Sequence, residues 1–133
     1  MSEKANWIDT HIKQISLYQQ QIKELPEVCV VERIELLSKM LVFIGKLAAE
    51  LSEEYKMIYA KRKRMHAEAY LKAPKNKQAE AELAVVDIRK EEAQAYGNMK
   101  RWVNAFESTK EEINALKYKL KVNIEDGSSR RNY

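Results

Sequence analysis

The hydrophobic residues of this chain recur at helical spacing along three segments. In the first, residues 3–24, apolar positions are separated by three or four residues, as in Ile8, Ile12, Ile15, Tyr18 and Ile22. This spacing places them on one face of an amphipathic helix. The helix is expected to end near Pro26, because the residue before a proline avoids the α region.

A second and stricter pattern covers residues 30–71. Its positions alternate steps of three and four without a break, which is the 3.5-residue period of a coiled coil. We call this stripe the first seam, and Arg62 is its polar member: Ile34, Leu37, Leu41, Ile44, Ala48, Leu51, Tyr55, Ile58, Arg62, Met65 and Ala69. The segment KAPKNK, residues 72–77, then breaks the helix, because Pro74 cannot continue it and Asn76 suits a turn.

The same period resumes over residues 78–122. We call this stripe the second seam, with Glu92 and Thr109 as its polar members: Ala81, Val85, Ile88, Glu92, Ala95, Met99, Trp102, Phe106, Thr109, Ile113, Leu116 and Leu120. Two long heptad helices joined by a short turn fold back most simply as an antiparallel hairpin.

The sequence therefore predicts an all-α fold. It consists of a long antiparallel helical hairpin, at about 30–71 and 78–122, and a shorter N-terminal helix at about 3–24. Residues 1–126 are expected to form a single helical domain. Residues 127–133 have no apolar period and are expected to form a disordered tail.

A hairpin also fixes which residues face each other. Pairing positions whose numbers sum to about 150 puts Gly45 opposite Phe106 and brings Arg62 within one turn of Glu92. Because an unpaired charge on a seam would cost several kcal/mol, we interpret Arg62 and Glu92 as a structural ion pair that fixes the register.

A second apolar stripe lies off the two seams: Leu36, Val42, Phe43, Leu47, Tyr59, Tyr70, Leu83, Val86, Tyr96 and Val103. One hairpin buries only one stripe of each helix, so these residues need another partner. The N-terminal helix can cover part of them. The remainder predicts self-association into a homo-oligomer through coiled-coil-like faces.

Composition supports the helical prediction and indicates the compartment. Hydrophobic residues make up 45% of the chain and charged residues 33%, with three Gly and two Pro, too few turn formers for an ordinary β domain. The single Cys29 excludes an internal disulfide, which favours a reducing cytoplasm. No signal peptide is visible, and the longest apolar run, residues 40–44, is far below the roughly 20 residues needed to span a bilayer. We therefore predict a cytoplasmic protein without a membrane partner.

The usual signatures of catalysis are missing from the sequence. It has no Gly-rich phosphate loop, no nucleophile elbow and no Cys or His pair at metal spacing. His11 and His66 are isolated, and the neighbouring carboxylates Glu91 and Glu92 point about 100° apart on a helix. We therefore expect a non-enzyme with no catalytic residues, no metal site and no cofactor.

Positive charge is concentrated in residues 56–77, KMIYAKRKRMHAEAYLKAPKNK. Eight cations stand there against one acid, a net charge of +7, while the flanking segments 26–55 and 78–97 each carry −3. Cations interleaved with tyrosines suit a single strand of nucleic acid, whose phosphates need charge and whose unstacked bases offer π faces. The candidate nucleic-acid-binding residues are Lys56, Tyr59, Lys61, Lys63, Arg64, Tyr70, Lys72, Lys75 and Lys77.

Three other interpretations of this basic segment remain open at this point. It is also typical of a charged helix face balanced by acids on the returning arm, of a localisation signal, or of a membrane-surface patch. The membrane interpretation is the weakest of them, because the apolar residues here already belong to the seam.

The order of elements resembles the small helical recombination proteins of tailed phages, particularly the UvsY-type recombination mediators. The matching pieces are KRKRMHAEAYLK, YGNMKRWVNAF and INALKYKLK, and the likeness covers roughly residues 36–126. The resemblance implies a ring-like, non-enzymatic homo-oligomer that binds single-stranded DNA. It also implies a mediator role, in which the protein helps a RecA-like recombinase displace the single-strand-binding protein, so these two proteins are further implied partners.

Carried onto this sequence, the resemblance makes the run Lys61, Arg62, Lys63 and Arg64 the strand-contacting candidates and Tyr59 and Tyr70 the stacking candidates. Phe43, Trp102 and Phe106 are interpreted as core or oligomer contacts. The alternative function is a helical protein-binding adaptor, such as a phage factor that docks on a host replication or transcription protein. Either function would be carried out in the cytoplasm, that of the host cell if a phage encodes the protein.

Overall fold

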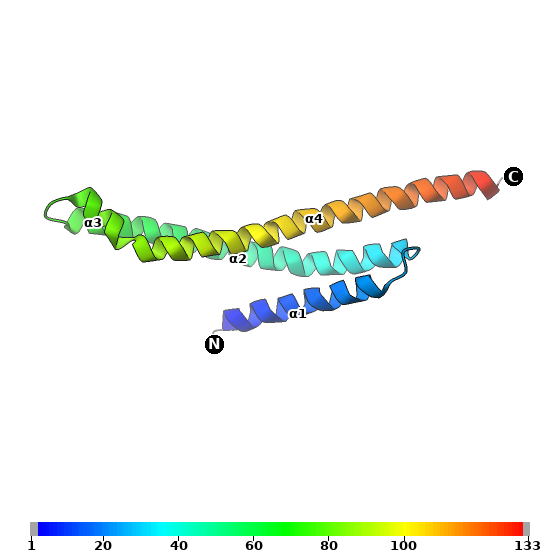
Figure 1. The fold of residues 1–133 in the computed structure, drawn as a ribbon, viewed down its shortest axis with the longest axis horizontal. Coiled ribbons are helices and arrows are strands. Elements are labelled where there is room, and N and C mark those ends of the chain that lie inside the picture. The colour runs from blue at the N-terminus through cyan, green and yellow to red at the C-terminus, as the bar shows by residue number, and fades with distance from the viewer. Residues whose placement is uncertain (1–2, 132–133) are drawn as a thin grey trace. The chain divides into compact units, whose positions relative to one another are not determined.

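The structure, a computed structural model, describes residues 3–131, with side chains through Asp126. Its described residues form four α-helices and no strand: α1 (Glu3–Glu24), α2 (Val30–Lys72), α3 (Lys77–Ala84) and α4 (Val86–Arg131) (Figure 1). The all-α prediction and the bounds of the first two helices are confirmed. None of these described helices is long and apolar enough to cross a membrane.

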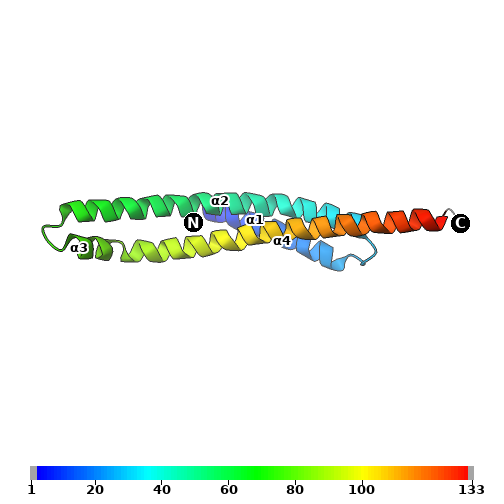
Figure 2. The ribbon, with the colours of Figure 1, turned by 90° about the horizontal axis from the view of Figure 1, so that it is seen from above.

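The helices belong to two compact units, which we describe separately. The first unit comprises Met1–Leu47 and Val103–Tyr133, and the second comprises Ala48–Trp102. Within each unit, α2 and α4 pack together and run in opposite directions, as a hairpin requires (Figures 1 and 2). That residues 1–126 fold as a single domain stays a prediction.

The seams account for this packing. Every seam position on α2, α3 and α4 is buried or half-buried, including the polar members Arg62, Glu92 and Thr109. The predicted register is also present. Gly45 lies against Phe106 in the first unit, and Arg62 pairs with Glu92 in the second.

The second arm of the hairpin, expected at about 78–122, is helical, with one interruption that the sequence did not predict: the chain breaks at Val85 between α3 and α4. Val85 has φ −110° and ψ 9°. Its N–H donates to the Glu82 carbonyl at 3.4 Å, three residues back and not the four of an α-helix, so the turn here is of the tighter 3₁₀ type. Val85 and Val86 are adjacent β-branched residues, which lose side-chain freedom in a helix. The second seam continues across the break, since its members here are buried: Ala81, Val85 and Ile88.

The turn between α2 and α3 follows the expected chemistry. Asn76 has the left-handed conformation, φ 52° and ψ 45°, which Asn tolerates better than most residues. The Lys77 ammonium donates to the carbonyls of Ala73 at 2.6 Å and Tyr70 at 3.2 Å. This places a cation at the C-terminus of α2, where unpaired carbonyls carry partial negative charge.

In the first unit, α1 lies beside the first part of α2 (Figure 1). Arg33 of α2 donates to the carbonyls of Ile22 and Leu25 at the end of α1, at 3.3 and 3.2 Å. The Phe43 ring lies 5.9 Å from the Tyr18 ring, and Leu47 is fully buried. The contact of α1 with the second apolar stripe is therefore present.

The end of α4 overlaps the tail that was expected to be disordered. The helix continues through Arg131, whereas residues 132–133 and the side chains from Gly127 on lie outside the described part of the chain. Disorder of residues 127–133 stays a prediction.

Two helical glycines allow a matched test of the register. A Cβ built on Gly45 would lie 3.1 Å from Cε2 of Phe106, whereas one built on Gly97 has no neighbour within 4 Å. We expect Gly97→Ala to raise the free energy of unfolding by about 0.5–1 kcal/mol, since Ala is the better helix former. Gly45→Leu should lower it by about 1–3 kcal/mol through overpacking. Urea unfolding of both variants checks this, and a Gly45→Leu protein as stable as the parent would contradict the register.

Candidate nucleic-acid interface

The nine residues proposed for nucleic-acid binding are all exposed: Lys56, Tyr59, Lys61, Lys63, Arg64, Tyr70, Lys72, Lys75 and Lys77. All of them lie in the second unit, on α2, the following turn and the first residue of α3. The structure does not place them on one surface, however. Successive helical residues are rotated by about 100°, so the basic run of α2 is distributed around the helix.

One side of α2, which we call the tyrosine flank, carries Lys56, Tyr59, Lys63 and Tyr70. Their steps of three, four and seven residues put them on one face of the helix. The Lys63 ammonium lies 5.1 Å from the centre of the Tyr59 ring, and the Arg62 guanidinium lies 5.2 Å from it. An exposed ring thus stands beside an exposed cationic side chain, which is a pairing that suits a base and its phosphate.

The other side of α2, which we call the lysine flank, carries Lys61, Arg64, Glu68 and Lys72. Arg64 Nε donates to Glu68 Oε1 at 2.8 Å, an exposed i to i+4 pair. The hydrogen bond from Arg64 lowers the pKa of the Glu68 carboxyl, and the charges of Arg64 and Lys72 add to this effect; the same pair raises the pKa of Arg64. This flank therefore carries an acid of its own and no aromatic residue.

The contacts of Lys77 also differ from those expected of the nucleic-acid-binding residue that the sequence suggested. Its ammonium is bound to the carbonyls that end α2 and lies 5.7 Å from the centre of the Tyr70 ring. Lys77 therefore has a structural role in the turn, next to a tyrosine of the flank. Lys75 lies in the turn itself and is exposed.

The ion pair inferred from the register is present between Arg62 Nε and Glu92 Oε2. Their side chains are only 18% and 16% exposed, so both charges are largely removed from water. Arg62 is thus held by α4 and is not a freely mobile strand contact, as its seam position indicated.

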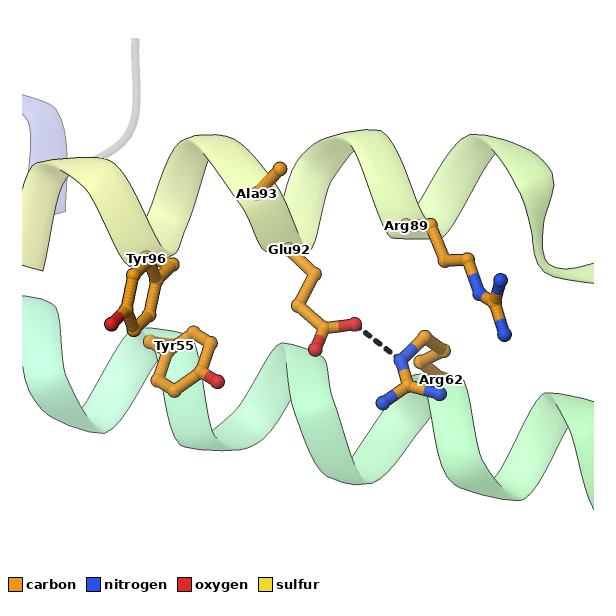
Figure 3. A pocket seen from close by; sticks show the side chains of 6 residues that line it. All are labelled: Tyr55, Arg62, Arg89, Glu92, Ala93 and Tyr96. Atoms are coloured by element: carbon orange, nitrogen blue, oxygen red, sulfur yellow. Dashed lines mark hydrogen bonds and ion pairs between the residues drawn. The ribbon is translucent and has the colours of Figure 1, made fainter.

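A groove beside this ion pair contains residues that the sequence analysis did not select. It has a volume of about 490 Å³ and lies between α2 and α4, within the second unit (Figure 3). Tyr55 and Tyr96 meet edge to face at 5.3 Å, and Tyr59 continues the cluster at 6.4 Å from Tyr55. The full lining is Tyr55, Arg62, Arg89, Glu92, Ala93 and Tyr96.

The hairpin register could have revealed this cluster, because Tyr55 and Tyr96 have numbers that sum to about 150. Arg89 also satisfies this rule with Arg62, since their numbers sum to 151, but its contact with Glu82 could not have been found in that way. Its Nη2 lies 3.0 Å from Glu82 Oε2 of α3, and Glu82 Oε1 lies 3.4 Å from His66 Nε2. The contact between Arg89 and Glu82 depends on how α3 and α4 are oriented relative to each other at the break at Val85.

The opposite side of the same helix pair has different chemistry. A smaller groove of about 260 Å³ there contains two carboxylates, Glu54 and Glu91, and is otherwise lined by Leu51, Ile58, Gln94, Ala95 and Asn98. Glu91 is exposed, and an exposed carboxylate repels phosphate. The aromatic and cationic side is therefore the better surface for a nucleic acid.

The aromatic residues interpreted as core or oligomer contacts are half-buried: Phe43, Trp102 and Phe106. Phe43 contacts α1, and Phe106 contacts Gly45, so both have partners within the first unit. Among the described residues, no group of three or more His, Cys, Asp and Glu side chains is arranged to hold a metal ion. Comparison of the chain with protein families, curated proteins and solved structures found no match.

Proposed function

We propose that this protein is a non-enzymatic, single-stranded DNA-binding protein and that the tyrosine flank of α2 is its contact surface. The observation that carries this proposal is the pairing of exposed tyrosines with lysines on one helix face, above all Tyr59 with Lys63 at 5.1 Å. The lysines stabilise bound phosphates, and stacking on an aromatic ring contributes about 1–3 kcal/mol of binding free energy for each unstacked base. A duplex offers no such free base faces, so a single strand is the better ligand.

The salt dependence of binding tests the proposal. Affinity for a fluorescently labelled single-stranded oligonucleotide should fall linearly with salt on logarithmic axes, with a slope of about −0.7 for each phosphate contact. A duplex of the same sequence is the matched control and should bind more weakly. A flat dependence, or no binding, would favour the adaptor function, because a helix held in an apolar groove depends little on salt.

The sequence resemblance extends the proposal to a role in phage recombination in the host cytoplasm. There the protein would bind DNA covered by a single-strand-binding protein and help a RecA-like recombinase to assemble on it. A loading assay with both proteins present separates a mediator from a plain DNA-binding protein, because only a mediator shortens the delay before the recombinase filament forms.

We also propose that the protein self-associates. Part of the second apolar stripe has no cover in the described structure: Val42 is 54% exposed, Leu83 is 69% exposed and Val86 is 45% exposed. Burying such side chains contributes about 25 cal/mol per Å² of apolar surface, which favours a second copy as their partner. Sedimentation at micromolar concentration should give a mass above the 15.6 kDa of one chain. Val42→Lys should reduce that mass, and a monomer throughout this range would reject self-association.

A further inference from the structure

The groove between α2 and α4 has the chemistry of a pocket for one nucleobase. Its volume of about 490 Å³ lies within the range of roughly 300–1,000 Å³ typical of small-ligand sites. Figure 3 shows Tyr55 and Tyr96 at one end, with the Glu92 and Arg62 pair beside them. An apolar, aromatic end next to a polar end is the arrangement that binds a planar ring carrying hydrogen-bonding groups on its edge.

The polar end of the groove has unused hydrogen-bonding capacity. Arg62 donates through Nε to Glu92 Oε2, and no bond from its two terminal nitrogens to another described residue is found. A guanidinium held by its Nε presents the two terminal N–H groups as a fixed fork. Glu92 therefore acts as a positioning residue, because it orients the fork without occupying it.

A fork of two donors selects among the four bases. Guanine presents two neighbouring acceptors, O6 and N7, and a guanidinium binds both at once. On that edge adenine replaces the first acceptor with an amino donor, thymine has only one acceptor, and cytosine presents only its amino donor. In a single strand this edge is free, and the purine ring offers the larger surface for Tyr55 and Tyr96.

We propose that this groove binds one guanine of the single strand, with Tyr55 and Tyr96 against the ring, the Arg62 fork on O6 and N7, and Glu92 positioning Arg62. Arg89 lines the same groove and its Nη2 is paired with Glu82 at 3.0 Å, so no phosphate contact is assigned to it. This inference rests on the proposed function and adds a base preference to it.

The test compares three twelve-nucleotide single strands by fluorescence anisotropy. The first contains only dT, the second contains isolated dG residues among dT, and the third has 7-deaza-dG in place of dG. The dG strand should bind about tenfold more tightly than the dT strand, as expected for one bidentate contact. The 7-deaza strand lacks N7 and should lose most of that difference, although its size, charge and stacking surface are almost unchanged.

A variant that fills the groove without changing any charge gives a second test of the guanine site. Ala93 lines the groove and is exposed, so Ala93→Leu should fill it and keep the helix. In this variant the ratio of affinities for the dG and dT strands should fall to about one. Ala60→Leu, an equal substitution at an exposed position of α2 outside the groove, should keep the full ratio.

The outcomes separate the inference from the function on which it rests. Equal binding of all three strands, or a full guanine preference in Ala93→Leu, would overturn the guanine site and leave single-stranded DNA binding intact. Failure of every strand to bind would instead reject the proposed function, and the guanine site with it.

Discussion

Arg62→Gln should lower the free energy of unfolding by about 2–3 kcal/mol. The substitution leaves the Glu92 carboxylate without its partner in a position that is only 16% exposed. Breaking a fully buried ion pair in this way costs about 3–5 kcal/mol, and the remaining contact with water reduces that cost here. Chemical denaturation followed by circular dichroism measures the change.

The double-mutant cycle with Glu92→Gln isolates the interaction. We expect a coupling energy of about 1–3 kcal/mol between the two positions. The matched control is Arg64→Gln, which removes an exposed arginine two residues away and should have little effect on stability. Arg62→Leu combined with Glu92→Leu should recover most of the lost stability, because an apolar pair on a seam avoids the desolvation of two charges. Zero coupling would mean that the pair does not hold the register.

Replacing Lys56 and Lys63 together by Gln should weaken binding to a single-stranded dT oligonucleotide by at least about tenfold near 0.1 M salt. The salt slope should become shallower by about 1.4, since each lost phosphate contact contributes about 0.7. Both side chains are exposed, so the variant should fold with unchanged stability. Anisotropy titrations at several salt concentrations measure affinity and slope together.

Lys61→Gln combined with Lys72→Gln is the matched control. It removes the same charge from the lysine flank, where no aromatic residue accompanies the cations, and should weaken binding much less. If both double variants lose the same affinity, the strand responds to net charge and the tyrosine flank has no special role. If neither loses affinity, the basic segment is a solvated helix face, and the adaptor function becomes the better proposal.

The difference between the two flanks of α2 could not be predicted from the sequence alone. The run from Lys61 to Arg64 is a single feature in the sequence, but on the helix Lys63 stands beside Tyr59, Arg64 pairs with Glu68, and Arg62 turns to α4. The position of Arg62 followed from the heptad period. The pairing of Arg64 and the binding of Lys77 to the end of α2 depended on side-chain conformations that a pattern of residue types does not contain.

By itself, the sequence determined the all-α class, the bounds of α1 and α2, both seams, the turn at Pro74 and Asn76, and the pairing of Arg62 with Glu92. These features follow from local periodicity and from the geometry of a hairpin, both of which are written along the chain. Only the tertiary structure decided the break at Val85, the contact of Arg89 with Glu82 and the side-chain conformations that leave an open groove beside Tyr55 and Tyr96. The physical reason is that each of these depends on the backbone direction and side-chain packing of two helices at once, whereas a periodic pattern specifies only which face of each helix is buried.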